Sequence, residues 1–496
     1  MHRRFFLTAW SLAAALVVAR TASAADAWIQ VKTDHFTVVS NASERRARNV
    51  GWQFEQVRAA IAKGWPWARV ELNRPVFVIA VKDEDSMRAM APEFWQQRGG
   101  TRPGSVFATG SDRHYVLLRA DIEEEGQGMN PYSQAYWSYS ALVLEASFNR
   151  GLPLWLTNGL ASVLSNTVVG DKEIVFGKPL PWLVERAQTS PHVSLAELFA
   201  VDRQSPYYRQ GVTRERFDAQ CWALVQFMLF GEKAAVGRRL NQLSAMLQNG
   251  VASDAAVREV YGSLDALDQA YSLYLHQGVF TYGRLQVASD TSALKAPVEK
   301  LSLAESDADR AAFHASMGRA VEARALLAEA RRADPSLAIP DEVEGMLLDR
   351  EQKSDEARQV FAKAVAAGSK NYYVYYRLAS LASGPGMTVE SMTTLAGHLD
   401  QATKLNPSFG PAFGYLASVE LQLNHGDRAV AAAQHAITLE PGNASSRMIL
   451  ANAFVRLSRR DEALKAAQDA LPLARNQQEY ASIQSMIASL GAATRP

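Results

Sequence analysis

A repeat with a period near 34 residues constrains the second half of the chain more than any other feature. Pro407 and Pro441 lie one full period apart, and Pro335 lies at a corresponding point. Small side chains at fixed points let paired helices approach closely, and a proline suits the start of the next unit. The pattern therefore predicts an all-α solenoid over 301–496. The small residues that recur in phase are Ala311, Ala323, Ala330, Gly345, Ala357, Ala364, Ala417, Ala429, Ala436, Ala451, Ala463 and Ala470.

The pattern resembles tetratricopeptide repeats, a family of paired helices. The resemblance implies an interaction module that holds a peptide or a partner helix in a groove, and it implies no chemistry. The alternative for this region is a helical bundle without repeats. Five units are expected at 304–335, 338–369, 371–407, 408–441 and 442–475, with a loop insertion around 383–388 and a capping helix at 477–490.

The first 24 residues have the pattern of a secretory signal peptide. His2-Arg3-Arg4 precedes an apolar run from Phe5 to Ala19, and Ala22-Ser23-Ala24 supplies a cleavage site of small residues. The run is too short for a stable membrane span, although an uncleaved anchor is the alternative. We therefore expect an exported chain, periplasmic or secreted, without a stable span after cleavage.

Charge and cysteine content restrict the partners and the cross-links. The chain has 52 basic and 51 acidic residues, so no overall field favours nucleic acid or an anionic membrane. Cys221 is the only cysteine, which excludes an intrachain disulfide. Its apolar helical surroundings predict a small buried side chain. The oligomeric state does not follow from the sequence.

Residues 25–278 place strands first and helices later, which predicts an α+β domain. Residues 279–300 are expected to link this domain to the repeats. The apolar pattern predicts strands within 28–40, at 76–81 and within 104–121, a helix at 43–63, and mostly helices after residue 180.

Two apolar helices are expected between Tyr136 and Asn166, joined at 149–151. Pro153 falls in the first turn of the second helix, where its missing N–H does least harm. The motif Leu152-Pro-Leu-Trp-Leu-Thr-Asn-Gly-Leu-Ala161, with Tyr136 and Tyr139 before it, resembles the active-site helix pair of gluzincin zinc peptidases of the peptidase-MA-like branch. The resemblance implies a zincin-like fold for 25–278.

The same resemblance shows that the metal chemistry is missing. It assigns the two zinc-binding histidines to Trp137 and Ala141, the general-base glutamate to Ser138 and the third ligand to Asn158, while Ser162 replaces a further glutamate. Tryptophan and alanine do not bind zinc, and an amide is a poor ligand. Serine does not take a proton from water at neutral pH. We therefore expect no metal, no cofactor and no catalytic residue here.

Trp137 has two interpretations. In the preferred one, its indole fills the volume that the metal and the histidines would occupy, since cores pack densely and an indole N–H needs a partner. In the other, a residual cleft still holds a peptide. The residues that would line it are Trp137, Ser138, Tyr139, Ala141, Trp155, Asn158 and Ser162.

The sequence as a whole predicts an exported, non-catalytic pseudo-peptidase that binds peptides or proteins through its repeats, with a role in envelope assembly. A hydrolase that uses an unrecognised site, with the repeats presenting substrate, is a second hypothesis. A scaffold whose first domain packs on the solenoid is a third.

Four histidines of the first domain are widely spaced and expected to be structural or exposed: His35, His114, His192 and His276.

Overall fold

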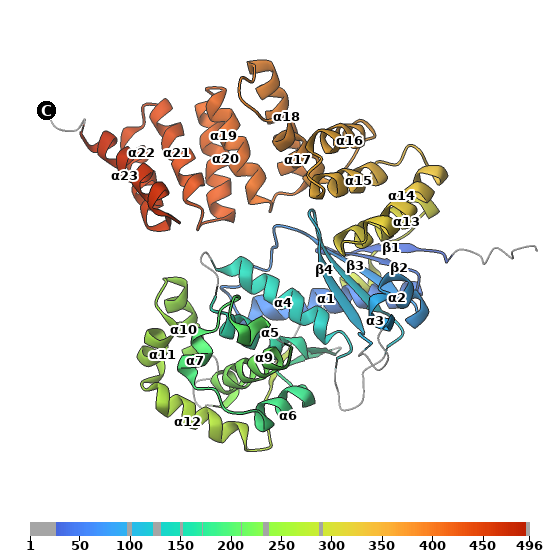
Figure 1. The fold of residues 1–496 in the computed structure, drawn as a ribbon, viewed down its shortest axis with the longest axis vertical. Helices are drawn as coiled ribbons and strands as arrows, with labels where there is room; N and C mark the ends of the chain where they lie inside the picture. Colours follow the sequence, from blue (N-terminus) through green and yellow to red (C-terminus); the bar gives the residue numbers. More distant parts are fainter. Residues whose placement is uncertain are drawn as a thin grey trace, which may run out of the picture.

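The fold is described from a computed structural model of the chain, and it has two parts (Figure 1). A mixed α/β part, up to residue 300, precedes a stack of helices that we call the repeat part. The predicted signal peptide and the joint at 149–151 lie outside the described residues. No helix within the described ranges is both long and apolar enough to cross a membrane. These ranges are 26–96, 102–122, 130–148, 152–170, 172–209, 211–231, 238–286 and 291–492.

A six-stranded mixed sheet forms the centre of the α/β part, in the order β4-β5-β3-β2-β1-β9. β2, β3 and β5 are parallel, and the other three strands are antiparallel to their neighbours. Every residue of β3 is buried, as expected for an apolar run in the middle of parallel strands. The strands are β1 (Ile29–Lys32), β2 (Phe36–Ser40), β3 (Val76–Val81), β4 (Ser105–Thr109), β5 (His114–Arg119) and β9 (Val298–Lys300).

The predicted combination of a mixed sheet with later helices is confirmed, while its zincin likeness stays a prediction. Helices α1 (Glu44–Gly64) and α4 (Ser133–Ser147) share one apolar core with the sheet and with α5 (Leu154–Ser165) and α9 (Gly211–Gln226). Cys221 on α9 is fully buried, as predicted. The smaller helices are α2 (Glu84–Met90), α3 (Glu93–Gln96), α6 (Pro181–Thr189), α7 (Leu195–Ala200), α8 (Pro206–Arg209), α10 (Arg238–Gln248), α11 (Ser253–Tyr261), α12 (Leu264–Leu275) and a π-helical turn (Phe227–Gly231).

The segment predicted to be a linker, 279–300, contributes strands to two sheets. β9 pairs with β1, and β8 (Gly283–Gln286) pairs with β7 (Glu173–Phe176) in a small sheet completed by β6 (Val168–Val169). Between β8 and β9, the short helix Ser292–Lys295 packs on α1. The described part of this segment is therefore hydrogen-bonded into the α/β part, and the predicted domain boundaries stay predictions.

The helix-pair repeat is confirmed, with five pairs and a final helix, α23 (Gln477–Ala492). The in-phase alanines are all fully buried. Position 345 requires glycine because a Cβ there would lie 2.5 Å from the ring of Phe361. The expected insertion lies between α17 and α18. The pairs are α13 (Leu303–Ser316) with α14 (Ala320–Ala333), α15 (Ile339–Arg350) with α16 (Ser354–Ala366), α17 (Tyr372–Ala382) with α18 (Val389–Leu405), α19 (Gly410–Gln422) with α20 (Gly426–Leu439), and α21 (Ala444–Arg456) with α22 (Arg460–Ala470).

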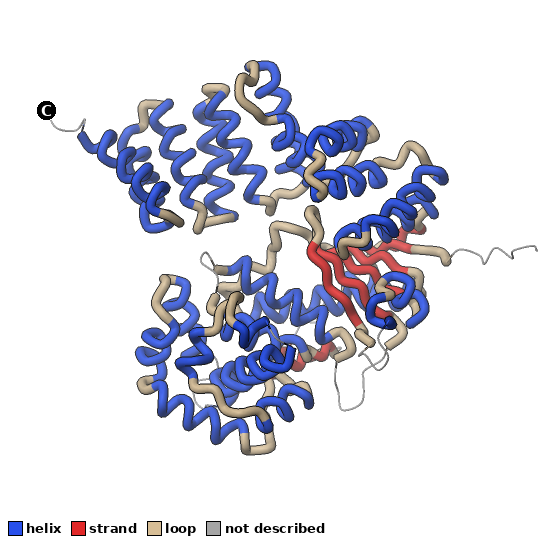
Figure 2. The backbone as a smooth tube through the Cα atoms, in the orientation of Figure 1, coloured by secondary structure: helices blue, strands red, loops and turns tan. Residues whose placement is uncertain are grey.

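The first repeat helix also belongs to the core of the α/β part. Phe313 of α13 is fully buried in a cluster with Trp28, Phe77 and Tyr115, on the opposite sheet face from α1 and α4. Figure 2 shows this helix directly beside the strands. The two parts therefore share apolar packing across their boundary.

The turn of the β4–β5 hairpin makes a second connection, which we call the junction. The hairpin tip points toward α15 and α17 (Figure 1). Asn371 Nδ2 donates to Asp112 Oδ2 (2.8 Å), and the Tyr372 hydroxyl donates to the carbonyl oxygen of Asp112 (2.6 Å). Asp112 also accepts from Arg113 Nε (2.8 Å). The junction is buried and polar, so its hydrogen bonds fix the hairpin against the first repeats.

Candidate functional site

Two residues that the sequence comparison placed at metal positions, Trp137 and Asn158, bond to their own neighbours. Trp137 Nε1 donates to Ser162 Oγ (3.2 Å), which joins α4 to α5. Trp137 is half-buried against the main core, and Ser162 is buried. The indole thus has the polar partner that the volume-filling interpretation requires.

Asn158, which the resemblance assigns to the third ligand, is buried and bonded to a carboxylate. Its Nδ2 donates to Asp218 Oδ1 (2.7 Å), and Arg214 Nε donates to the same carboxylate (2.9 Å). Burial raises the pKa of Asp218, although Arg214 and Asn158 act in the opposite direction. The Arg214 guanidinium lies 3.8 Å from the centre of the Tyr208 ring. The Asn158 amide is therefore occupied by protein partners.

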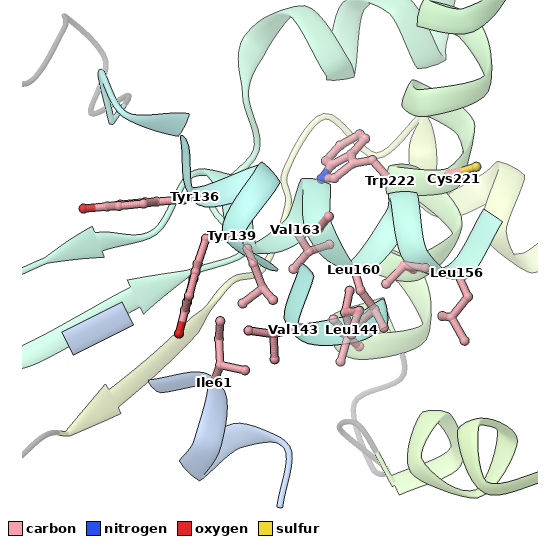
Figure 3. Close-up of a cluster of buried hydrophobic side chains, with 14 of the residues drawn as sticks. Ile61, Tyr136, Tyr139, Val143, Leu144, Leu156, Leu160, Val163, Cys221 and Trp222 are labelled. Carbon is pink, nitrogen blue, oxygen red and sulfur yellow. The ribbon is translucent and has the colours of Figure 1, made fainter. Parts of the chain in front are cut away.

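The other residues predicted for a residual cleft lie on α4 and α5, and most of them are buried. Ser138 is buried and Ala141 is half-buried on α4. Trp155 is buried, with Nε1 donating to Ser253 Oγ (3.2 Å). Tyr139 is buried and belongs to the apolar cluster drawn in Figure 3. Within the described residues, no group of three or more His, Cys, Asp or Glu side chains is arranged to hold a metal ion.

A large opening, which we call the long cleft, lies between the α/β part and the repeats. It has a volume of about 1000 Å³. Two hydrogen bonds cross between the parts near it, from Arg69 Nη1 to the Leu439 carbonyl (3.1 Å) and from Asn406 Nδ2 to the Asn73 carbonyl (2.9 Å). Its walls are 68–71, Asn73, Ala146 and Phe148 on one side and the repeat turns Ser408, 438–443 and 473–475 on the other.

No pattern in the sequence indicates this cleft. Its two walls come from segments separated by hundreds of residues, and neither wall carries a motif. The only signal in the sequence is positional, since the prolines Pro407 and Pro441 mark the repeat turns that form one wall.

A smaller cavity of about 250 Å³ adjoins the long cleft, and the two share Val70, Glu71 and Ser408 as lining residues. We call it the His35 cavity. His35 Nδ1 lies 2.8 Å from Glu55 Oε2, and its backbone N–H donates to Glu55 Oε1 (2.8 Å). Glu55 therefore fixes the imidazole ring. His35 is hydrogen-bonded and partly exposed, which agrees with the role expected from the sequence.

Comparisons with known proteins find likeness in the solved structures alone. No known protein family and no curated protein matches the chain. YrrB, described as a TPR protein with an unusual peptide-binding site, is 19% identical over 36% of this chain and 90% of that chain, with a TM-score of 0.31. MamA is 20% identical over 36% and 95%, with a TM-score of 0.28. A thermophilic TPR protein of Thermus thermophilus is 19% identical over 38% and 99%, with a TM-score of 0.25.

Proposed function

We propose that this chain is an exported, non-catalytic peptidase-like protein that binds a peptide or protein partner beside its repeats and acts in envelope assembly. The observation that carries the proposal is the state of the emptied metal positions. Trp137 and Asn158 bond to Ser162 and Asp218, so their polar groups are used inside the protein. Neither position offers a free ligand for zinc or a base for water.

The long cleft is the surface that best fits a partner. Its volume is at the upper end of the range typical of ligand sites, and it lies between two packed parts, where such sites are common. One wall consists of repeat turns, which present backbone N–H and C=O groups beside side chains. An extended peptide uses such backbone groups for affinity and side-chain contacts for selectivity.

Metal analysis of the purified protein tests the non-catalytic half of the proposal. We expect no bound zinc in the wild type, because the resemblance leaves no ligand at its metal positions. A matched variant restores all four positions with Trp137→His, Ser138→Glu, Ala141→His and Asn158→Glu. One equivalent of zinc bound to the wild type with sub-micromolar affinity contradicts the proposal. Casein cleavage by the wild type that chelators do not inhibit favours the alternative hydrolase.

Peptide binding tests the other half. A pool of fluorescein-labelled peptides of random sequence is the probe, and anisotropy with the full chain is the measurement. Ala146 is exposed on α4 and lines the long cleft, so Ala146→Trp is expected to fill the cleft and abolish binding. Ala328→Trp, at an exposed position of α14 outside the cleft, is the matched control and should leave binding unchanged. Binding that survives Ala146→Trp removes the cleft from the proposal.

A further inference from the structure

The His35 cavity contains two buried hydrogen-bond donors without partners. Tyr139 is 2% exposed, and its hydroxyl has no hydrogen-bond partner among the described residues. The same holds, within those residues, for Nε of Arg58. Both side chains line the His35 cavity. Buried polar groups are normally paired, so two unpaired donors on residues that line one cavity point to an acceptor that comes from outside the chain.

The charges at this cavity select the kind of acceptor. Arg58 and Arg74 line the cavity, together with Asp34 and Glu71. Asp34 is exposed, whereas Glu55 is already engaged by His35 and Thr33. Without Glu71, Arg58 and Arg74 would only balance the carboxylates of Asp34 and Glu55. Arg58 would then lack its anionic partner, so a carboxylate that reaches its guanidinium would restore the ion pair.

Glu71 shows which anion fits. Its carboxylate pairs with Arg58 Nη2 and lies 3.8 Å from His35 Nε2, yet its side chain is 64% exposed. An exposed side chain swings away at small cost, since pairs of this kind contribute little to stability. Glu71 therefore occupies, from within the chain, a place that a carboxylate of a ligand would take.

We propose that the His35 cavity binds a carboxylate group of the partner peptide, which displaces Glu71 and accepts hydrogen bonds from the Tyr139 hydroxyl and the Arg58 guanidinium. The inference rests on the proposed peptide-binding function and adds the chemistry at one end of the bound peptide. The lining residues shared between cavity and cleft give the route, because a chain in the long cleft reaches the cavity past Val70 and Ser408. The carboxylate comes from the chain terminus or from an acidic side chain.

The test uses the full chain and three labelled peptide pools whose random positions exclude Asp and Glu. One pool has a free C-terminal carboxylate, one has a C-terminal amide, and one has the amide plus a single internal Glu. Anisotropy should show roughly tenfold tighter binding of a carboxylate-bearing pool than of the neutral pool, as one charge-assisted hydrogen bond provides. The first and third pools distinguish the two sources of the carboxylate.

Three variants connect that preference to the cavity. Tyr139→Phe and Arg58→Gln should each reduce it, whereas Glu71→Gln should increase carboxylate binding by removing the competing group. Tyr136→Phe is the matched control on the same helix, because the Tyr136 hydroxyl donates to Gln53 Oε1 (3.0 Å). It should lower the melting temperature and leave the preference unchanged. Tyr139→Phe should not lower the melting temperature, since its hydroxyl has no partner to lose within the described structure.

Each outcome decides between the two proposals. Equal binding of all pools that Ala146→Trp abolishes overturns the carboxylate site and leaves the proposed function intact. A carboxylate preference that Tyr139→Phe and Glu71→Gln do not change also overturns the site. No binding of any pool overturns both proposals. A clear loss of stability in Tyr139→Phe shows that the hydroxyl has a partner in the free protein, and this contradicts the inference at its first step.

Discussion

Replacing Phe313 by Ala tests whether the repeats and the α/β part share one core. Phe313 belongs to the first repeat helix, is fully buried and lies with its ring centre 6.2 Å from that of Tyr115 on β5. Truncation of a buried phenylalanine typically costs about 3–5 kcal/mol, because apolar contact is lost and a cavity remains. The cavity would lie against Trp28, Phe77 and Tyr115 of the sheet. The α/β part should therefore lose stability although the change is in the repeats.

Tryptophan fluorescence separates the two parts in this experiment. No tryptophan follows Trp222 in the sequence, so the signal reports on the α/β part alone. The free energy of unfolding obtained from fluorescence in urea should be lower for Phe313→Ala than for the wild type. The difference should be most of the expected cost of about 3–5 kcal/mol. Phe361→Ala is the matched control, since Phe361 is equally buried in a cluster formed only by repeat residues. Phe361→Ala should reduce the helicity measured by circular dichroism. It should lower the free energy of unfolding obtained from fluorescence by less than Phe313→Ala does. A fluorescence transition that Phe313→Ala leaves unchanged refutes the shared core.

Three further predictions concern single positions. Asp309 on α13 is buried near the junction, and burial raises its pKa to about 7 against the opposing charge of Arg113. The folded protein then binds this proton more tightly than the unfolded chain, so stability present at low pH is lost as the pH rises toward 7. Asp309→Asn should therefore make the melting temperature depend less on pH between pH 5 and 8. Trp137→Phe removes the bond to Ser162 and should cost about 1 kcal/mol in urea unfolding, and no loss would mean that the bond contributes nothing. Gly345→Ala places a Cβ 2.5 Å from the Phe361 ring, so calorimetry should show destabilisation of about 1–3 kcal/mol despite the better helix propensity of alanine.

The repeat part was predictable because its paired helices need small side chains at fixed points, and this need recurs in every unit. Each small residue, such as Ala417 or Ala451, meets the same need for close helix contact, so the phase in the sequence carries the structure. The strands of the α/β part were predictable for a similar reason, since β3 is an unbroken apolar run that is buried on both faces. Pairing between distant segments has no such signal. The partner of β1 on its outer side, β9, lies in the segment expected to be a linker.

The loss of a zinc site stays a prediction. It rests on the residue types at 137, 138, 141 and 158, which are not those of a zinc site. Their partners do not follow from the sequence, because Asn158 bonds to Asp218 on another helix and Trp137 bonds to Ser162 across the helix pair. Tyr139 belonged to the predicted residual cleft, and it also lines the His35 cavity, which no spacing in the sequence indicates.

The junction and the long cleft depend on each other. Asp112 holds the start of α17 through Asn371 and Tyr372, and the shared packing around Phe313 holds α13 on the sheet. The later repeats contact the α/β part through sparser bonds, such as the one from Arg69 to Leu439. In a solenoid each unit contacts mainly its neighbours, so a repeat far from the fixed end moves by small changes summed over the intervening units. Of the repeat turns that line the cleft, 473–475 is therefore the one furthest along the solenoid from the junction and the best placed to move.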